Sequence, residues 1–342
     1  MIYTTQINPF EESIITDEYR WIHNYAVMYQ NKRNNNECFF DANNLRCAFT
    51  LLRSFSEIPA KLYINEIYEE YVNMFCCERQ KDAHTGVIDS KKHAVILEYK
   101  ELEKSHGGFV IEGERLIKRA IDDKLMIKNI IYSNKSPLEK DGYIQKANCL
   151  GYSCYISNEG IMSAITTSKP VPSEIAACVM PQYSLKSILY GEYTSLLITD
   201  NVSNPDNLGL VIRTADACGA DAVIVTGTGA APYHKNCVRA SRGALGRLPV
   251  LYFPDGKSVI EELKSTGVMV IGTSAHAKTV IETLHDGNVP KKFAAVIGSE
   301  SFGISPAIAE LCDVMIRIDM ARGQSSFNVA VAAGIILNRL MM

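Results

Sequence analysis

The carboxyl-terminal half of the chain repeats one pattern, in which short, mainly apolar segments alternate with helical segments. The apolar segments are 195–200 (SLLITD), 221–227 (DAVIVTG), 249–253 (PVLYF), 268–274 (VMVIGTS), 294–300 (AAVIGSE) and 314–319 (VMIRID). Apolar strands joined by helices are typical of a parallel sheet that is covered on both faces. We therefore predict an α/β domain over residues 190–342. In such sheets ligands bind beyond the carboxyl ends of the strands, so residues at those ends are the candidates for a functional site.

Two further zones precede this domain. Residues 1–104 include segments such as 45–55 (LRCAFTLLRSF), whose apolar residues recur at three- and four-residue spacing, and we predict a small helical domain. Residues 105–182 contain short strand-like runs with helical pieces between them, so we predict a smaller α/β domain there. A run at 109–111 is followed by a helical segment with one apolar face, formed by Leu116, Ile117, Ala120 and Ile121. The length of 342 residues suits two or three domains.

Composition excludes some classes of protein. The net charge of −3 gives no overall basic field for nucleic acid, although a local basic patch is sufficient for binding. The ten cysteines contain no C-x-x-C pair and the seven histidines no paired ligand spacing, so we expect reduced thiols and no metal site. The amino-terminal segment lacks the pattern of a signal peptide, and the longest apolar run, VAVAAGIIL, is too short for a membrane span. We expect a soluble cytoplasmic protein.

The first strand end is followed by a strong helix-start signal. Asn204-Pro205-Asp206-Asn207 combines turn residues with a helix N-cap, and Gly219 is expected to end the helix. The buried stripe of this helix is predicted to comprise Leu208, Val211, Ile212 and Ala215. Arg213 lies beside that stripe, where it is either a solvated side chain or a functional one.

The next strand end leads into a basic segment. Residues 227–254 contain no acidic residue but carry five basic ones: His234, Lys235, Arg239, Arg242 and Arg247. Such a stripe is either a solvated helix face or a set of phosphate contacts. The stretch 227–232 (GTGAAP) partly matches a dinucleotide-binding turn, but the third small residue and the acidic residue of that motif are missing.

Two more segments at strand ends carry polar residues. Glu300 ends a strand between Gly298 and Gly303, where a carboxylate holds a ligand hydroxyl or caps backbone N–H groups. The last strand runs into a polar loop followed by an apolar terminal helix, and we expect Ser325 or Ser326 to cap that helix.

Together these segments resemble the three motifs of the TrmH/SpoU family of SPOUT-class ribose 2′-O-methyltransferases. The matching segments are 204–221 (NPDNLGLVIRTADACGAD), 296–305 (VIGSESFGIS) and 318–337 (IDMARGQSSFNVAVAAGIIL). Their order and spacing both fit. Residues 105–182, with FVIEGERLIKRAI, resemble the ribosomal-protein-L30e-like substrate-binding module that often precedes this domain. Residues 1–104 carry no such resemblance.

The resemblance implies a trefoil knot near the carboxyl terminus, bound S-adenosylmethionine, and a homodimer whose active site uses residues of both subunits. The implied cofactor-binding residues are Thr273, Gly298, Ile318, Met320 and Phe327. The implied catalytic residues are Asn207, Arg213, Glu300, Ser326 and Asn328. The sequence departs from the family pattern at Asp319, which stands where a proline is usual, and at Phe327, which replaces leucine.

These residues predict a division of roles. A guanidinium resists deprotonation, so we expect Arg213 to bind the phosphate beside the target ribose and to stabilise the developing alkoxide. Ser326 and Asn328 are expected to orient the hydroxyl, and Glu300 to hold the motif loops. No metal is needed, because the sulfonium already carries the charge of the leaving group.

We expect Lys235, Arg239, Arg242 and Arg247 to hold RNA together with the L30e-like module. Large-subunit ribosomal RNA is the first expectation for the substrate, and transfer RNA is the second. A non-catalytic RNA-binding relative of the fold is another alternative. A nicotinamide dehydrogenase would rest on GTGAAP alone.

Overall fold

The computed structural model describes residues 84–341 except 106–107, 124, 167, 182, 190–192, 284–289 and 322–325. Contacts divide the chain into two units, Met1–Ala42 and Asn43–Met342, and every described residue belongs to the second. The helical domain expected over residues 1–104 therefore lies largely outside the described residues. Within the part that is described, no helix combines the length and the apolar character that crossing a bilayer requires.

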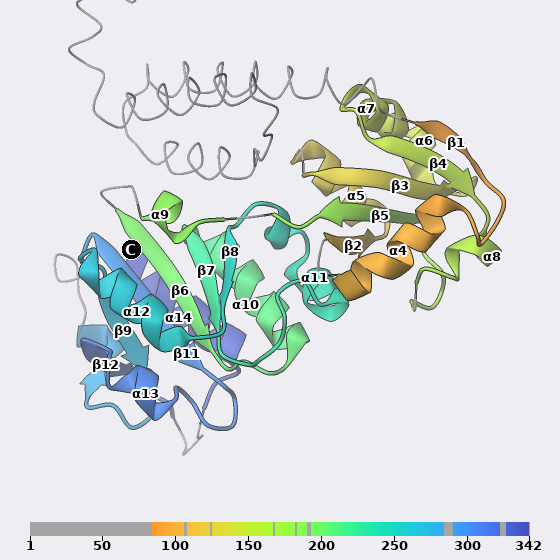
Figure 1. The fold of residues 1–342 in the computed structure, drawn as a ribbon. Coiled ribbons are helices and arrows are strands. Elements are labelled where there is room, and N and C mark those ends of the chain that lie inside the picture. The colour runs from red at the N-terminus through yellow and green to blue at the C-terminus, as the bar shows by residue number, and fades with distance from the viewer. Residues whose placement is uncertain are drawn as a thin grey trace, which may run out of the picture. The chain divides into compact units, whose positions relative to one another are not determined.

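The carboxyl-terminal half forms a seven-stranded sheet in the order β10-β12-β9-β11-β6-β7-β8 (Figure 1). Its strands are β6 (Thr194–Asp200), β7 (Ala222–Thr226), β8 (Val250–Phe253), β9 (Met269–Thr273), β10 (Thr279–Val280), β11 (Lys292–Gly298) and β12 (Val314–Arg317). Every pairing in this sheet is parallel. The α/β architecture with a parallel sheet is confirmed, and each of the six apolar segments overlaps one strand. Only the two-residue β10 was not anticipated.

Alternate residues of the strands pack on opposite faces of this sheet. In β6, Leu197 belongs to one buried cluster, whereas Leu196 and Ile198 belong to another. The first cluster includes α10 (Pro205–Cys218), α11 (Lys235–Ser241) and α14 (Val329–Met341). The second includes α9 (Leu185–Ile188), α12 (Gly256–Ser265) and α13 (Pro306–Ala309). Burial on both faces explains why these strands are apolar throughout.

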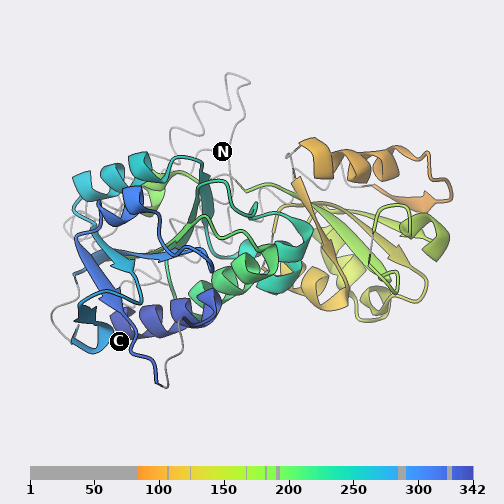
Figure 2. The same cartoon turned by 90° about the horizontal axis from the view of Figure 1, so that it is seen from below.

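Helix α10 forms as its sequence predicts. The Asn204 side-chain oxygen accepts hydrogen bonds from the backbone N–H groups of Asp206 (2.8 Å) and Asn207 (3.3 Å). Gly219 ends the helix in the left-handed conformation, with φ 86°. The predicted apolar stripe is buried. Figure 2 shows α10 beside α14, and the two helices are in contact.

A second sheet has five strands in the order β1-β4-β3-β5-β2. Its strands are β1 (Thr85–Ile88), β2 (Gly108–Glu112), β3 (Ile127–Ser133), β4 (Ser153–Ser157) and β5 (Glu174–Val179). Strands β1, β4 and β3 are parallel, and β5 runs antiparallel to its neighbours β3 and β2. Among the described residues, five helices accompany it: α4 (Ala94–Ser105), α5 (Glu114–Asp122), α6 (Pro137–Lys140), α7 (Tyr143–Cys149) and α8 (Glu159–Met162).

This sheet begins earlier in the chain than the sequence indicated. The α/β zone was expected from residue 105, yet β1 pairs with β4, and α4 buries Ile96 and Tyr99 in a cluster with sheet residues. Strand β1 is a short edge strand in which only Ile88 is buried. An edge strand needs no apolar run, so the sequence carries little signal for it.

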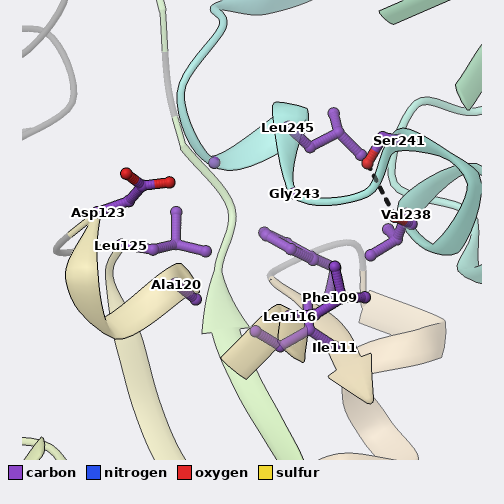
Figure 3. Close-up of a pocket in the computed structure, with 11 residues that line it drawn as sticks. Phe109, Ile111, Leu116, Ala120, Asp123, Leu125, Val238, Ser241, Gly243 and Leu245 are labelled. Carbon is purple, nitrogen blue, oxygen red and sulfur yellow. Dashed lines mark hydrogen bonds between the residues drawn. The ribbon is translucent and has the colours of Figure 1, made fainter. Parts of the chain in front are cut away.

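Residues of α5 and β2 pack against the segment around α11. Phe109 and Leu125 lie with Val238 and Leu245 around a pocket of about 20 Å³ (Figure 3). The Arg119 guanidinium also donates a hydrogen bond to the carbonyl oxygen of Arg242 at 2.9 Å. A space of this size holds about one water molecule, so the pocket is a packing gap and no site for a nucleotide or cofactor.

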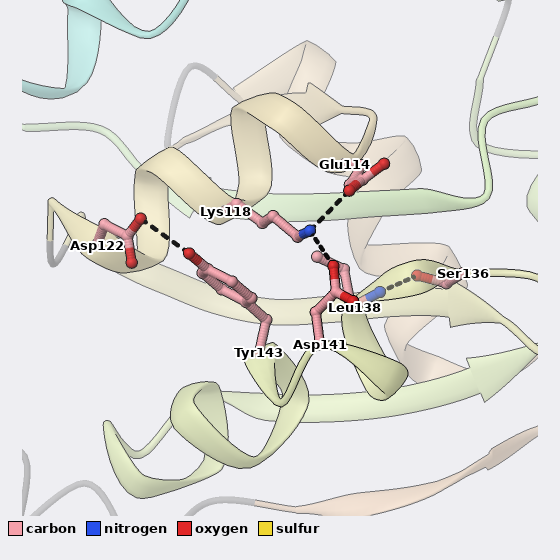
Figure 4. A network of polar contacts seen from close by, with 7 residues as sticks. All are labelled: Glu114, Lys118, Asp122, Ser136, Leu138, Asp141 and Tyr143. Atoms are coloured by element: carbon pink, nitrogen blue, oxygen red, sulfur yellow. Dashed lines mark hydrogen bonds and ion pairs between the residues drawn. The ribbon is translucent and has the colours of Figure 1, made fainter.

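Polar contacts join α5 to α6 and α7 (Figure 4). The Lys118 ammonium donates to Glu114 at 2.6 Å and also to Asp141, while the Tyr143 hydroxyl donates to Asp122 at 3.1 Å. The hydrogen bonds to Asp141 and Glu114 raise the pKa of Lys118. The Lys118 side chain is 21% exposed, but its partners Glu114 and Asp141 are 45% and 47% exposed, so water screens these ion pairs and they fix the geometry of α5 more than they stabilise the fold.

Candidate functional site

A cavity of about 450 Å³ opens beyond the carboxyl ends of β9, β11 and β12. All five residues expected to contact the cofactor line it: Thr273, Gly298, Ile318, Met320 and Phe327. Glu300 and Ser326, from the expected catalytic set, line it as well. The cavity therefore lies at the edge of the sheet where ligands of such folds bind.

A tight turn after β11 forms one wall of the cavity. Ser299 and Gly303 exchange two backbone hydrogen bonds of 3.0 and 2.9 Å across the turn, and the Phe302 N–H donates to the Ser299 hydroxyl at 3.2 Å. A Cβ at Gly298 would lie only 1.9 Å from the carbonyl carbon of Gly303. The close approach of the two backbone segments thus requires glycine at position 298.

The opposite wall is tied to the sheet. The Thr273 hydroxyl donates to the carbonyl oxygen of Val296 at 2.9 Å and links the end of β9 to β11. Ile318 and Phe327 add apolar side chains on the segment between β12 and α14. The lining therefore combines backbone polar groups with apolar side chains, which suits a ligand that has both a flat ring and polar ends.

Three of the expected catalytic residues are joined by hydrogen bonds. The Asn328 Nδ2 donates to Asn207 Oδ1 at 3.2 Å, and the Asn207 Nδ2 donates to Glu300 Oε1 at 2.6 Å. Asn207 lies in the first turn of α10, Glu300 follows β11, and Asn328 precedes α14. The structure thus brings together one residue from each of the three segments singled out in the sequence.

Asn328 has a second role as the cap of α14. Its side-chain oxygen accepts from the Ala330 N–H at 2.9 Å, and its carbonyl oxygen accepts from the Ala332 N–H at 2.9 Å. The expectation that Ser325 or Ser326 caps the helix is wrong. Helix α14 begins at Val329, so the capping position falls on Asn328, and Ser326 lines the cavity instead.

Arg213 lies apart from this cluster. Its side chain is exposed on α10 and makes no hydrogen bond or ion pair with the residues that the structure describes. Six residues separate it from Asn207, which corresponds to about 9 Å along a helix axis.

The basic residues of segment 227–254 do not form one continuous surface of unpaired charges. Arg247 pairs with Asp216 of α10, and both side chains are about two-thirds buried or more. The exposed Arg239 pairs with Asp206 at 3.1 Å. Arg242 is exposed at φ 52°, after the end of α11. The acids that neutralise this segment come from α10, which a search of the neighbouring sequence could not reveal.

Sequence reasoning missed a guanidinium in the cavity wall. The Arg317 Nε donates to Asp319 Oδ1 at 2.8 Å, and one terminal nitrogen of Arg317 donates to the carbonyl oxygens of Ala277 (2.8 Å) and Lys278 (2.7 Å). Arg317 therefore joins the segment after β12 to the segment after β9. The one available signal was an arginine two residues before an aspartate at the end of a strand.

The described residues contain no group of three His, Cys, Asp or Glu side chains arranged to hold a metal ion. The titratable side chains that line the cavity are a carboxylate, Glu300, an imidazole, His276, and a guanidinium, Arg317. The arrangement can hold and orient a hydroxyl group by hydrogen bonding and can place a positive charge near it.

A protein-family model described as the SpoU rRNA Methylase family matches residues 194–338. The 23S rRNA (guanosine(2553)-2′-O)-methyltransferase RlmP of Bacillus subtilis (strain 168) is 30% identical over 259 residues, covering 74% of this chain and 98% of that protein. The 23S rRNA (uridine(2479)-2′-O)-methyltransferase of Streptomyces viridochromogenes is 28% identical over 236 residues, covering 68% of this chain and 81% of that protein.

Solved structures agree with these sequence relatives. The AdoMet-bound rRNA methyltransferase from Sinorhizobium meliloti is similar with a TM-score of 0.65 and 25% identity, covering 75% of this chain and 97% of that one. The SpoU methyltransferase AviRb from Streptomyces viridochromogenes, in complex with AdoMet, gives a TM-score of 0.64 at 26% identity, covering 73% and 97% of the two chains.

Proposed function

Because the chain belongs to the SpoU rRNA methylase family, we propose that it methylates a ribose 2′-hydroxyl of large-subunit ribosomal RNA with S-adenosylmethionine. One observation carries this proposal. The cavity beyond β9, β11 and β12 has the hydrogen-bonded residues Asn207, Glu300 and Asn328 beside it. The two relatives named above, both 23S rRNA 2′-O-methyltransferases, support the choice of substrate.

The cavity fits S-adenosylmethionine by its shape and its lining. Gly298 allows the turn after β11 to close against the end of that strand and form one wall, and Ile318 and Phe327 offer apolar surface for an adenine ring. We propose that these residues, with Thr273 and Met320, hold the cofactor. When bound, S-adenosylmethionine supplies a methyl group on a positively charged sulfur.

The protein's own residues must place and polarise the ribose hydroxyl. Asn328 uses its side-chain oxygen and one N–H within the protein, which leaves its second N–H for the ribose oxygen. Ser326 lies beside it on the cavity wall and is proposed to orient the same hydroxyl. Glu300 accepts from Asn207 and so fixes both amides in one orientation.

Arg213 is proposed to bind the phosphate next to the target ribose and to stabilise negative charge as it develops on the oxygen. A guanidinium stays protonated, so this role is electrostatic and Arg213 is not the base. Its exposed position on α10 would allow it to serve the site of a second subunit.

Homodimerisation through α10 and α14 is part of the proposal. Leu210 and Val331 are apolar residues on these two neighbouring helices, and they are 38% and 51% exposed. The helices approach closely, because a Cβ at Gly334 would lie 3.2 Å from the Thr214 methyl group. Burial of the exposed side chains in a dimer would bring Arg213 to the interface.

We propose that RNA is held by Lys235, Arg239 and Arg242. Arg247 is excepted because it and its partner Asp216 are 33% and 19% exposed, whereas Arg239, although paired with Asp206, is 68% exposed. The five-stranded sheet unit is proposed as the L30e-like substrate-binding module, beginning with β1 instead of at residue 105. We further propose that the chain forms a trefoil knot around the cofactor cavity, through the segments on either side of 322–325.

Methylated riboses should be mapped in ribosomal and transfer RNA from cells with and without the gene. The proposal expects one 2′-O-methyl group of large-subunit ribosomal RNA to disappear and to be restored in vitro by the purified protein. Loss of a mark from transfer RNA alone would contradict the choice of substrate. Absence of any lost mark, together with no methyl transfer in vitro, would refute the enzyme.

The proposed role of Arg213 has a separate test. Arg213→Ala should slow methyl transfer by about 100-fold or more, as loss of a transition-state contact does, while calorimetry finds the affinity for S-adenosylmethionine unchanged. Arg213→Lys keeps the charge but loses the bidentate fork, so it should recover only part of the rate. Near-normal turnover of Arg213→Ala would exclude a catalytic role.

A further inference from the structure

Phe302 is the most exposed of the large apolar side chains that the structure describes. The residue is 91% exposed, compared with 70% for Val87 and 60% for Tyr193, which come next. It lies at the tip of the turn between Glu300 and Gly303 and contributes to the rim of the cofactor cavity. A ring in this position gains nothing for the fold from the hydrophobic effect.

The tip that carries Phe302 is held firmly. The two backbone hydrogen bonds between Ser299 and Gly303 close the turn, and the Phe302 N–H is bound by the Ser299 hydroxyl. Beyond the turn, the Ser305 N–H donates to the buried carboxylate of Asp200 at 2.7 Å. The ring is therefore presented from a fixed backbone, which lowers the entropy cost of binding through it.

The position of the proposed reaction limits what can approach this ring. Methyl transfer requires the ribose oxygen to come within about 3–3.5 Å of the methyl group, so the target nucleotide must lie at the mouth of the cavity. Glu300 lines that mouth and stands two residues before Phe302 in the turn. Asn207 is hydrogen-bonded to Glu300. The base attached to the target ribose must then pass close to the tip of the turn.

Aromatic side chains bind unstacked RNA bases by stacking, and every base offers a π-face for this contact. We propose that Phe302 stacks on the base of the nucleotide that is methylated and so holds its ribose at the cavity mouth. The proposal rests on the function proposed above and adds a positioning contact to it. Such a contact fixes the place of the base and discriminates little between bases, because stacking uses the ring face common to all four.

Two other occupants of this position can be distinguished by experiment. The adenine of the cofactor already has Phe327 and Ile318 as apolar walls, so Phe302 at the rim is not required for it. A second copy of the chain would be expected on the exposed apolar residues of α10 and α14, which belong to other segments of the chain. If Phe302 contacted the cofactor, its loss would weaken cofactor binding, and if it contacted a second copy of the chain, its loss would change the mass in solution. The RNA contact predicts neither effect.

The test compares Phe302→Ala, Phe302→Leu and Phe302→Tyr with the wild-type protein on unmodified 23S ribosomal RNA. Methyl transfer, the RNA concentration giving half-maximal rate, the affinity for S-adenosylmethionine and the mass in solution are measured for each. Tyr193→Ala is the matched control, because Tyr193 is an exposed aromatic at the amino end of β6, opposite the cavity.

Phe302→Ala should raise the half-maximal RNA concentration by about 10- to 100-fold, the range expected for losing one base–aromatic stack. Phe302→Tyr should stay within about 3-fold of wild type and Phe302→Leu should lose most of the contact, because leucine keeps apolar bulk without a π-face. Cofactor affinity and mass should not change, and Tyr193→Ala should behave as wild type.

The proposal is overturned if Phe302→Leu equals Phe302→Tyr, if Phe302→Ala weakens cofactor binding, or if Phe302→Ala changes the mass in solution. Normal RNA dependence of Phe302→Ala overturns it as well. These failures differ from failure of the proposed function, in which the wild-type protein itself transfers no methyl group to 23S ribosomal RNA.

Discussion

The amide of Asn328 is shared between the end of a helix and the proposed active site. Its oxygen caps α14, and its nitrogen begins a chain of donors that passes through Asn207 to Glu300. The chain runs in one direction only. Glu300 can only accept, so the amide of Asn207 must point its nitrogen toward Glu300 and its oxygen toward Asn328.

Asn328→Asp should separate the two roles. Aspartate caps a helix about as well as asparagine, so the free energy of unfolding should stay within about 0.5 kcal/mol of wild type. The new carboxylate would face the oxygen of Asn207 without a donor, so methyl transfer should fall sharply. Asn328→Ala should lose both the activity and about 1 kcal/mol of stability. Denaturant unfolding and methyl-transfer rates measure the two effects, and equal activity of Asn328→Asp and wild type would disprove the role of the donor.

Asp319 stands where the family has a proline, and the structure offers a physical substitute for the stiffness of proline. Its carboxylate binds Arg317, whose guanidinium also holds the carbonyl oxygens of Ala277 and Lys278. Proline restrains the backbone by fixing φ, whereas this ion pair restrains it through side chains that bridge two segments of the cavity wall.

Asp319→Asn should therefore weaken the binding of S-adenosylmethionine by about 2- to 5-fold, the range of a partly exposed ion pair. The loss should be largest at low salt, because salt screens the pair in the wild-type protein. Asp319→Pro should restore affinity and make it insensitive to salt. Calorimetry at two salt concentrations is the measurement, and an unchanged affinity of Asp319→Asn would show that the pair does not shape the cavity.

Among the elements, α10 carries the tightest packing constraint on a helix. A Cβ at Gly209 would lie 2.5 Å from the carbonyl oxygen of Cys237 and 2.7 Å from the Cβ of Ala240, both in α11. At Gly334 in α14 the nearest atom would be a Thr214 methyl at 3.2 Å. Gly209 thus permits α10 and α11 to cross closely. A Cβ at Gly334 would meet only a side chain, which can move slightly.

Gly209→Ala should destabilise the protein by about 1–3 kcal/mol, because the overpacking outweighs the gain in helix propensity. Gly334→Ala is the matched control and should have little effect, since the propensity gain offsets a mild contact. Urea unfolding of both variants checks the prediction. Equal stability of the two would contradict a close approach of α10 and α11.

The sequence predicts elements well where burial is complete and poorly at edges. The strands of the parallel sheet are apolar on both faces and could be found, whereas the edge strands β1 and β10 leave most of their residues partly or fully exposed. The order of strands, with β12 between β10 and β9, depends on packing between distant segments and has no local signal. The sequence pattern favoured a serine as the cap of α14, because several polar residues precede the helix. The residue at which the helix begins decides which of them is the cap, and the sequence does not specify it.

Local patterns also predict the site only in part. The position of Glu300 at a strand end was informative by itself, the resemblance to the family motifs implied Asn207 and Asn328, and the structure brings the three together. The pairing of Arg247 with Asp216 and the exposure of Phe302 depend on which segments meet in space. Neither could be read from the neighbouring sequence.

At the scale of the whole molecule, burial controls the chemistry of the described cysteines. Burial raises the pKa of the Cys154 thiol to about 12 and also raises the pKa of Cys178 and Cys237. In the unfolded chain a thiol ionises near pH 8.5. The folded protein keeps these thiols neutral, so the stability that they contribute is fully present below about pH 8.5 and is lost as the pH rises toward 12.

The free energy of unfolding should therefore fall above about pH 8.5, by up to about 1.4 kcal/mol per pH unit for each buried thiol. Cys154→Ala should reduce this slope, after allowance for its own packing cost at neutral pH. Alkylation of the native protein should modify the exposed Cys149 well before Cys154, Cys178 and Cys237. Denaturant titrations at several pH values and peptide mass spectrometry are the measurements; a slope that is the same in Cys154→Ala would rule out this thiol as a cause.

The hydrogen bonds of the site also bear on the order of folding. Asn207 is 93 residues from Glu300 and 121 residues from Asn328 in sequence. Contacts of such high sequence separation form late, because the intervening chain must first be ordered. A partly folded chain lacking α14 would have no complete cofactor cavity. Binding of S-adenosylmethionine would then favour the fully folded state alone, so the cofactor concentration in the cell would set how much of the protein is folded as well as how fast it works.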